Sequence, residues 1–220
     1  MITISVNRPG RSAARTGLRG LPKGRGKRMR EEKRRTRQRE IEDAAYRLIG
    51  EKGYDGMSML AVARAARASN ETLYNWYGDK LGLFRAMVTT NADEIRSQLE
   101  TVEPGDDPVQ ALERVSPKLL AMLTGERAIA LNRAAAADPT GQLGKALAQN
   151  GRSLVMPMIR GLIVAASDAG LISIRSPEEA VEWFLALLIG DLQVRRVTGA
   201  LEALSPEEIS ARSAKAMTAF

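Results

Sequence analysis

The segment from Ser58 to Lys80, SMLAVARAARASNETLYNWYGDK, limits the possible folds of this chain more than any other, because it predicts two short helices joined by a tight turn. In its first half, apolar side chains recur at the period of a helix with one buried side, at Met59, Val62, Ala63 and Ala66. Ser58 precedes this helix as an N-cap, and Ser69 caps the second helix after the turn.

The second helix of this segment is predicted to have one apolar and one polar side. Leu73 and Tyr77 lie one turn apart and face inward. The residues that face outward are Asn70, Glu71, Tyr74 and Asn75. Amides pair with adenine, a carboxylate accepts from cytosine, and a tyrosine hydroxyl reaches phosphate oxygens, so this side can read a DNA groove. A solvated helix hairpin would show the same pattern.

An earlier helical segment completes a small three-helix core. Apolar residues recur at helical spacing from residue 41 to 49, and Gly53 is placed to end that helix in a left-handed conformation. Together with residues 58–80, this arrangement resembles the N-terminal domain of the TetR-type transcriptional repressors. The resemblance covers about residues 37–90, with the helix-turn-helix near 59–78.

Individual positions carry this resemblance. Residues 66–69 stand where the family has Ala-Gly-Val-Ser, and residues 72–77 match its Thr-Leu-Tyr-x-His-Phe segment. Ser58 matches a family Ser or Thr, and Lys80 matches the usual lysine.

Three departures from the family pattern are visible. Arg67 replaces the frequent turn glycine, so the turn either avoids a positive φ or carries strain. Trp76 replaces the usual histidine, and residues 81–82 replace acidic residues that often follow the lysine. The indole N–H of Trp76 can still donate to a phosphate oxygen.

The resemblance implies roles for individual residues. Those nearest the bases would be Asn70, Glu71, Thr72 and Asn75. Those that anchor phosphates or pack beneath them would be Ser58, Ser69, Tyr74, Trp76, Tyr77 and Lys80, with Arg67 as an extra cation near the DNA. In a dimer, two such helices would enter successive major grooves about 34–36 Å apart, so the operator would be a palindrome or near-palindrome.

Positive charge is concentrated at the N-terminus. The chain has a net charge of +7, and positions 1–40 carry 14 basic and 3 acidic side chains. Residues 1–30 are rich in Gly and Arg and have no long apolar run, so we expect disorder in isolation. Three interpretations remain open: an arm that binds phosphates or the minor groove, a solvated tail, or a translation start at Met29.

The chain contains neither cysteine nor histidine. Disulfides, thiolate metal sites, imidazole zinc sites and Ser-His-Asp triads are therefore excluded. The sequence shows no closely spaced acidic pair on an apolar helical face and no Gly-rich phosphate loop, so we expect no enzymatic activity, no metal and no cofactor. No apolar run approaches the length of about 18 residues that a membrane-spanning helix needs, so we expect a cytoplasmic protein without a membrane partner.

The part of the chain after residue 90 is predicted to be helical throughout, including one helix over about 140–169 that Pro157 kinks. Methionines around a kink can adapt to apolar ligands. The residues considered for an effector pocket are Met122, Met156, Met158 and Trp183, with Asn132, Arg133, Asn150 or Arg160 as polar anchors. Ordinary core or surface positions are the alternative for each. The resemblance implies a pocket in this half without assigning its lining.

A second predicted helix, 178–198, is apolar on nearly all sides and therefore needs two packing partners. One partner is its own domain, and the other is the same helix of a second subunit, with close approach at a glycine. A last helix after Ser205 would complete a four-helix interface. The candidate interface residues are Trp183, Leu187, Gly190, Ile209 and Phe220. A helix buried at the centre of a monomer is the alternative.

These observations predict an all-α protein in three parts: a basic arm (1–30), a DNA-binding domain (31–90), and a helical effector-binding and dimerisation domain (91–220). The predicted function is that of a homodimeric regulator, a repressor released from double-stranded operator DNA by an unknown small molecule. Two alternatives are an architectural protein that binds nucleic acid through the arm with little sequence preference, and a helical carrier or enzyme with a pocket and no operator.

Overall fold

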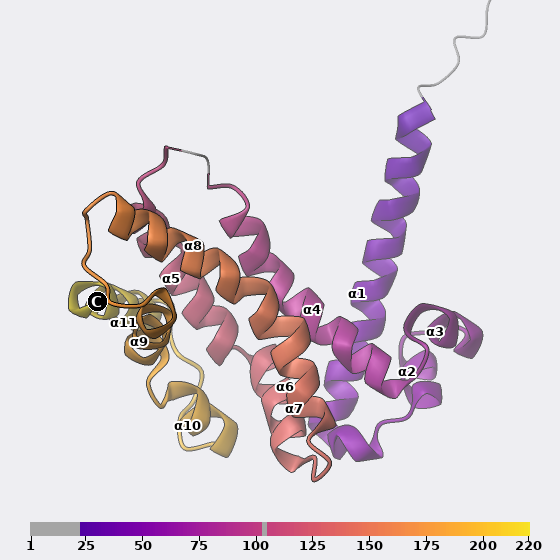
Figure 1. Cartoon of the computed structure of the whole chain (residues 1–220). Helices are drawn as coiled ribbons and strands as arrows, with labels where there is room; N and C mark the ends of the chain where they lie inside the picture. The colour runs from indigo at the N-terminus through magenta and orange to yellow at the C-terminus, as the bar shows by residue number, and fades with distance from the viewer. Residues whose placement is uncertain (1–22, 103–104) are drawn as a thin grey trace, which may run out of the picture. The chain divides into compact units, whose positions relative to one another are not determined.

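The computed structural model describes residues 23–102 and 105–220, with side chains from Arg28 onward, and the regular structure in these ranges is helical (Figure 1). The elements are α1 (Lys23–Gly56), α2 (Met59–Ala65), α3 (Asn70–Tyr77), α4 (Lys80–Leu99), α5 (Pro108–Thr124), α6 (Glu126–Ala137), α7 (Gln142–Leu147), the π-helix η1 (Ala148–Arg152), α8 (Ser153–Asp168), α9 (Pro177–Ile189), α10 (Leu192–Thr198) and α11 (Pro206–Ala219). The predicted all-α fold is confirmed.

The chain divides into two compact units, residues 1–38 and 39–220, and α1 contributes to both. Residues 1–22 of the predicted arm lie outside the described residues. Residues 23–30, for which we predicted no helix, form the first turns of α1. Lys, Arg and Met are good helix formers, which explains why this segment can extend a helix without an apolar side and in spite of Gly24 and Gly26.

Side-chain caps start the two short helices of the predicted helix-turn-helix. Ser58 Oγ accepts a hydrogen bond from Ala61 N at 3.2 Å, and Ser69 Oγ accepts one from Thr72 N at 3.0 Å, as the sequence predicted. Gly53 has a φ of 71°, so the regular part of α1 ends at the predicted glycine.

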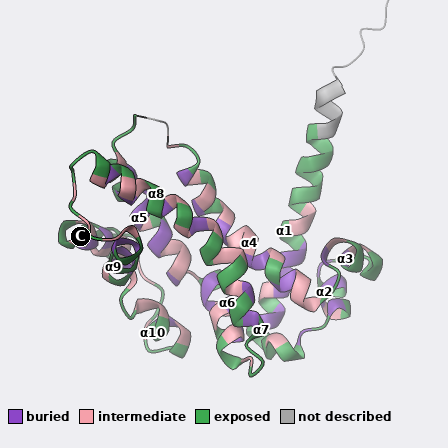
Figure 2. Cartoon of the chain, in the orientation of Figure 1, coloured by how far each residue is buried: buried purple, intermediate pink, exposed green. Residues whose placement is uncertain are grey.

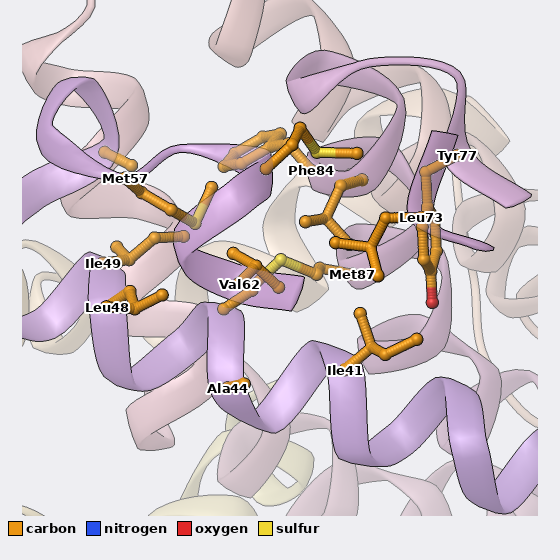
Figure 3. Packing of buried hydrophobic residues seen from close by; sticks show 14 of the residues in the cluster. Ile41, Ala44, Leu48, Ile49, Met57, Val62, Leu73, Tyr77, Phe84 and Met87 are labelled. Carbon is orange, nitrogen blue, oxygen red and sulfur yellow. The ribbon is translucent and has the colours of Figure 1, made fainter. Parts of the chain in front are cut away.

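The first hydrophobic core forms where α1, α2 and α3 meet, which confirms the predicted three-helix packing. Its labelled members in Figure 3 are Ile41, Ala44, Leu48, Ile49, Met57, Val62, Leu73, Tyr77, Phe84 and Met87. The core is larger than predicted, because α4 supplies Phe84 and Met87 and α6 supplies Leu131 and Ala134. Helices α2 and α3 are therefore also held by α4 and by α6, which comes from the second half of the chain.

The second hydrophobic core lies among α4, α5, α8, α9 and α11, and the buried faces of these helices point toward one another (Figure 2). Phe184 is fully buried here, and its ring lies edge-on to that of Phe220 at 5.6 Å between centroids. Because α4 contributes to both cores and contacts α3 as well as α5 and α8, it connects the two regions. Among the described residues, no helix combines the length and apolar composition that a membrane span requires.

Two long helices predicted from the sequence are interrupted in the structure. The predicted helix 140–169 consists of α7, the π-helical turn η1 and α8, and η1 ends five residues before Pro157, which lies inside α8. The predicted helix 178–198 ends at Ile189, because Gly190 adopts a φ of 53°, and α10 begins two residues later. Apolar periodicity continued across both breaks, so it gave no signal for them.

Candidate nucleic-acid interface and effector cavity

Helix α3 presents a polar surface on a buried apolar base. Leu73 is fully buried and Tyr77 is 9% exposed, so both belong to the first core. The exposed residues are those that the helical spacing placed outward: Asn70, Glu71, Tyr74 and Asn75. This side offers two amides, a carboxylate and a phenol to a partner, which is the chemistry that reads base edges and phosphate oxygens.

Other predicted contact residues are partly engaged within the chain. Thr72 is half-buried, and its hydroxyl lies 2.7 Å from that of Ser69. Trp76 is half-buried against the first core, and its ring is edge-on to Tyr77 at 6.5 Å. These residues shape the base of α3 while Asn70 and its exposed neighbours remain accessible.

Lys80 joins the end of α1 to the start of α4. Its Nζ donates to the carbonyl oxygen of Asp55 at 3.3 Å and lies 4.2 Å from the centre of the Tyr54 ring. Asp79 caps α4 through a 2.6 Å hydrogen bond from Gly82 N. The lysine therefore has a structural role in this state, in addition to the phosphate contact that we predicted for it.

The turn between α2 and α3 has an arginine in a conformation that favours glycine. Arg67 has a φ of 52° and is the only described non-glycine residue with a positive φ. Its N–H donates to Arg64 O at 3.2 Å, and Ala68 N donates to Ala63 O at 2.8 Å, which is the Schellman pattern that ends a helix. The sequence left open whether this turn is strained, and the structure shows that it is.

We expect Arg67→Gly to raise the free energy of unfolding by about 0.5–1 kcal/mol. Relief of the left-handed strain, about 1–2 kcal/mol, exceeds the entropy that glycine adds to the unfolded chain. Urea unfolding measures this change. Arg67→Ala is the matched control, because it removes the cation and keeps the strain, so a gain in Arg67→Ala as large as that in Arg67→Gly would contradict the backbone explanation.

A buried carboxyl group lies where α1 meets α4 and α6. Glu42 is 5% exposed, and Thr90 Oγ1 on α4 donates to it at 3.2 Å. Burial raises the pKa of Glu42 to about 7, although the Thr90 hydrogen bond and the Arg127 charge act against this shift. Arg127 on α6 pairs instead with Asp43 at 2.6 Å. Helices α1, α4 and α6 are thus joined by polar contacts beside the first core.

A cavity of about 350 Å³ opens among α4, α5, α6, η1, α8, α9 and α10. It brings together three of the predicted pocket residues, Met122, Asn132 and Met156. Arg133 lines a different hollow of about 720 Å³ between α1 and α6, and it donates to the carbonyl oxygens of Arg196 and Val197. The other four predicted pocket residues do not line the smaller cavity: Met158, Trp183, Asn150 and Arg160.

Sequence reasoning missed several lining residues of this smaller cavity. Asn91 on α4, Arg152 on η1 and Gln193 on α10 all face it, although more than one hundred positions separate the first from the last. The only sequence clue to this packing is the glycine at position 151. A Cβ there would lie 3.1 Å from Val88 Cγ1, so glycine lets η1 approach α4 closely.

Two family descriptions match different parts of the chain. Residues 41–87, which contain the helix-turn-helix, match the bacterial regulatory proteins of the tetR family. Residues 110–220 match the C-terminal domain of AefR-like transcriptional repressors. The chain belongs to the TetR family. It is therefore a DNA-binding transcriptional regulator that reads DNA with a helix-turn-helix.

Solved TetR-family structures resemble this regulator along most of its length. A TetR transcriptional regulator from Agrobacterium tumefaciens is 36% identical, with a TM-score of 0.67 over 83% of this chain and 91% of that chain. A TetR-family regulator from Mesorhizobium loti MAFF303099 is 26% identical, with a TM-score of 0.66 over 84% and 94%. The flavonoid-responsive regulator FrrA shares the fold at 23% identity, with a TM-score of 0.63 over 83% and 94%. No curated protein matches the chain.

The predicted dimer residues of this TetR-family chain lie on α9, on α11 and at their ends. Trp183 is 65% exposed and, with Leu187 and Phe220, lines a surface hollow of about 530 Å³. Ile209 is half-buried on α11. Gly190 makes its close approach within the chain, because a Cβ there would lie 2.8 Å from Arg212 Nη2.

Proposed function

We propose that this TetR-family regulator is a homodimeric repressor that binds a near-palindromic operator through α3 and leaves it when a small molecule occupies the cavity of about 350 Å³. The observation that carries the proposal is the polar side of α3, exposed along its length and held by two buried residues, Leu73 and Tyr77. A rigid base of this kind positions side chains for sequence-specific contacts.

The contacts of α3 are proposed to divide between bases and phosphates. Asn70, Glu71 and Asn75 would read base edges, whereas the hydroxyl of Tyr74, which is 49% exposed, would reach a phosphate oxygen.

We therefore expect Glu71→Ala to change base preference and Tyr74→Phe to weaken binding to all sites alike. Loss of a base-edge contact costs about 1–3 kcal/mol at the affected position, whereas loss of a phosphate contact acts on every sequence. Affinities for a library of operator variants distinguish the two effects. Uniform losses in both variants would contradict this division.

The dimer is proposed to form through α9 and α11. Trp183 exposes a large indole beside Leu187 and Phe220, and buried aromatic residues contribute strongly to protein interfaces. The two-fold axis would relate the two copies of this surface and set the distance between the two α3 helices.

We expect Trp183→Glu to weaken dimerisation about thirtyfold, because it removes an apolar anchor and places two like charges near a two-fold axis. Sedimentation equilibrium without DNA measures this change. Leu60→Glu is the control, since Leu60 is also exposed, at 47%, but lies on α2. An unchanged monomer–dimer equilibrium in Trp183→Glu would exclude this surface as the interface.

Helix α4 is the proposed route from the cavity to DNA. Val88, Asn91 and Ala92 line the cavity, while Phe84 of the same helix is buried in the first core with Leu73 of α3. A ligand that fits the cavity better in one position of α4 would favour that position. Release follows if the favoured position changes the spacing of the two α3 helices.

The basic N-terminal segment is proposed to add non-specific affinity. Its described side chains at positions 28–36 of α1 are exposed, and they include Arg28, Arg30, Lys33, Arg34 and Arg35. Such cations displace counterions from DNA, so their contribution falls with salt. The size of this contribution distinguishes the repressor from an architectural protein. In an architectural protein, the basic segment would supply all the affinity for DNA.

Recovery and sequencing of genomic fragments bound by the purified protein at physiological salt tests the proposal. We expect fragments that share a near-palindromic sequence. Fragments with no common sequence, together with complete loss of binding after deletion of residues 1–38, would favour the architectural protein.

A further inference from the structure

We propose that the cavity of about 350 Å³ binds an anionic aliphatic amphiphile, with an alkyl chain of about ten carbons inside and a carboxylate head group at Arg152. The identification of this ligand as the effector rests on the proposed function. The ligand class itself rests on the side chains that line the cavity.

The body of the cavity suits an alkyl chain. Most of its walls are aliphatic or thioether side chains, including Val88, Leu119, Met122, Leu131, Val155 and Leu185. The described lining residues include no carboxylate and no aromatic ring. A cation therefore finds neither an ion-pair partner nor a π face there, and cationic ligands are disfavoured.

Arg152 supplies the only charge among the described lining residues. Its side chain is exposed, and no hydrogen bond or ion pair between described residues engages its guanidinium group. A free guanidinium can hold a carboxylate through two parallel hydrogen bonds, which are stronger than bonds between neutral groups. The head group of a ligand with its chain in the cavity would therefore lie at Arg152.

Each of the three amides of the lining makes one contact within the chain through its nitrogen. Asn132 Nδ2 donates to Ala128 O at 2.8 Å, and Gln193 Nε2 donates to Leu123 O at 2.8 Å. Asn91 Nδ2 lies 3.2 Å from the sulfur of Met122. Each amide thus fixes a neighbouring turn or side chain, and Arg152 is left as the strongest recognition group.

The volume of the cavity limits the length of the chain. An apolar cavity of about 150 Å³ is known to accommodate benzene, with six carbons. By that measure a volume of about 350 Å³ holds about fourteen non-hydrogen atoms. A carboxylate with ten carbons satisfies this limit.

The proposed head-group site lies where η1 meets α4. Arg152 is the last residue of η1, and the adjacent Gly151 packs against Val88 of α4 so closely that a Cβ would lie 3.1 Å from Val88 Cγ1. A carboxylate at Arg152 and a chain against Val88 would therefore act together on the contact between η1 and α4.

Calorimetric titration of the full chain with sodium decanoate, 1-decanol and decylammonium chloride tests the ligand class, because these probes share an alkyl chain and differ in head-group charge. We expect decanoate to bind about tenfold more tightly than decanol, which corresponds to about 1.4 kcal/mol, and decylammonium to bind most weakly. In Arg152→Gln, we expect the affinity of decanoate to fall to that of decanol.

Arg160→Gln is the matched control, because Arg160 lies outside the cavity on α8 and pairs with Glu178 at 2.9 Å. It should leave the preference for decanoate unchanged. Decylammonium binding as tightly as decanoate, no binding of decanoate, or an unchanged preference in Arg152→Gln would each overturn the proposed ligand class.

A DNA-release measurement separates this inference from the proposed function. If decanoate binds with the expected preference but leaves the recovered operator fragment bound, the ligand class stands and release by the ligand is wrong. If the operator is bound specifically but decanoate does not bind the protein, the repressor proposal stands and the ligand class is wrong.

Discussion

At pH 8, replacement of Glu42 by glutamine is expected to raise the free energy of unfolding by about 3 kcal/mol. The carboxyl group is 5% exposed, and its burial raises the pKa from 4.5 to about 7, so ionisation in the folded protein costs about 1.4 kcal/mol per pKa unit. Glutamine fills the same space without a charge, and the hydroxyl of Thr90, 3.2 Å from the carboxylate, can accept a hydrogen bond from its amide.

The effect has a defined pH window. Because the folded protein holds this proton more tightly than the unfolded chain, protonation of Glu42 stabilises the fold below pH 4.5, and this stabilisation is lost as the pH rises toward 7. The groups that act on Glu42 are Thr90 and Asp93 on α4, Asp43 on α1 and Arg127 on α6. The chain has no histidine, so histidine titration does not overlap this window.

Urea unfolding of the wild-type and Glu42→Gln proteins at pH 4.5 and pH 8 measures the effect. We expect nearly equal stabilities at pH 4.5 and the full difference at pH 8. Asp43→Asn is the control, because it removes the neighbouring half-exposed carboxylate that pairs with Arg127, and such pairs contribute at most about 1 kcal/mol. A difference between wild type and Glu42→Gln that does not change with pH would show that ionisation of Glu42 is not its cause.

The burial of Glu42 could be predicted from helical spacing alone. Residues 42, 45 and 49 lie on one side of α1, so Glu42 shares a side with Ala45 and Ile49, both of which are buried. The spacing thus indicates a buried position. It does not indicate the partner, because Thr90 and Arg127 come from helices whose packing depends on contacts distant in the chain.

Features that depend on neighbouring residues could be predicted from the sequence. Features that need distant helices to come together could not. The caps by Ser58 and Ser69 and the buried positions of α3 follow from spacings of a few residues, and the structure confirms them. The cavity required Asn91, Met122 and Gln193 to meet from three helices. Periodicity shows which side of a helix is apolar but not which helix it faces, so Trp183 was placed both in the pocket and at the interface, and the structure puts it on the surface.

Arg196→Ala is expected to lower the free energy of unfolding by about 2–3 kcal/mol, because a buried carbonyl oxygen that loses its hydrogen-bond donor costs about 1–3 kcal/mol. Arg196 is 6% exposed, and its Nε and Nη1 donate to the carbonyl oxygens of Thr124 at 3.1 Å and Leu201 at 3.2 Å. Its Nη2 pairs with the carboxylate of Glu126, the first residue of α6. Alanine would leave these acceptors without their donor and remove the packing of the arginine stem.

Urea unfolding at one fixed protein concentration measures this loss, since dimerisation would make stability depend on concentration. Arg195→Ala is the matched control, because Arg195 is the preceding residue of α10 and is exposed, so its loss should change stability by no more than about 0.5 kcal/mol. Equal stabilities of the two variants would contradict the anchoring role of Arg196. Because Gln193 of the same short helix lines the cavity, we expect Arg196→Ala to weaken binding in the cavity as well, whereas Arg195→Ala should leave it unchanged.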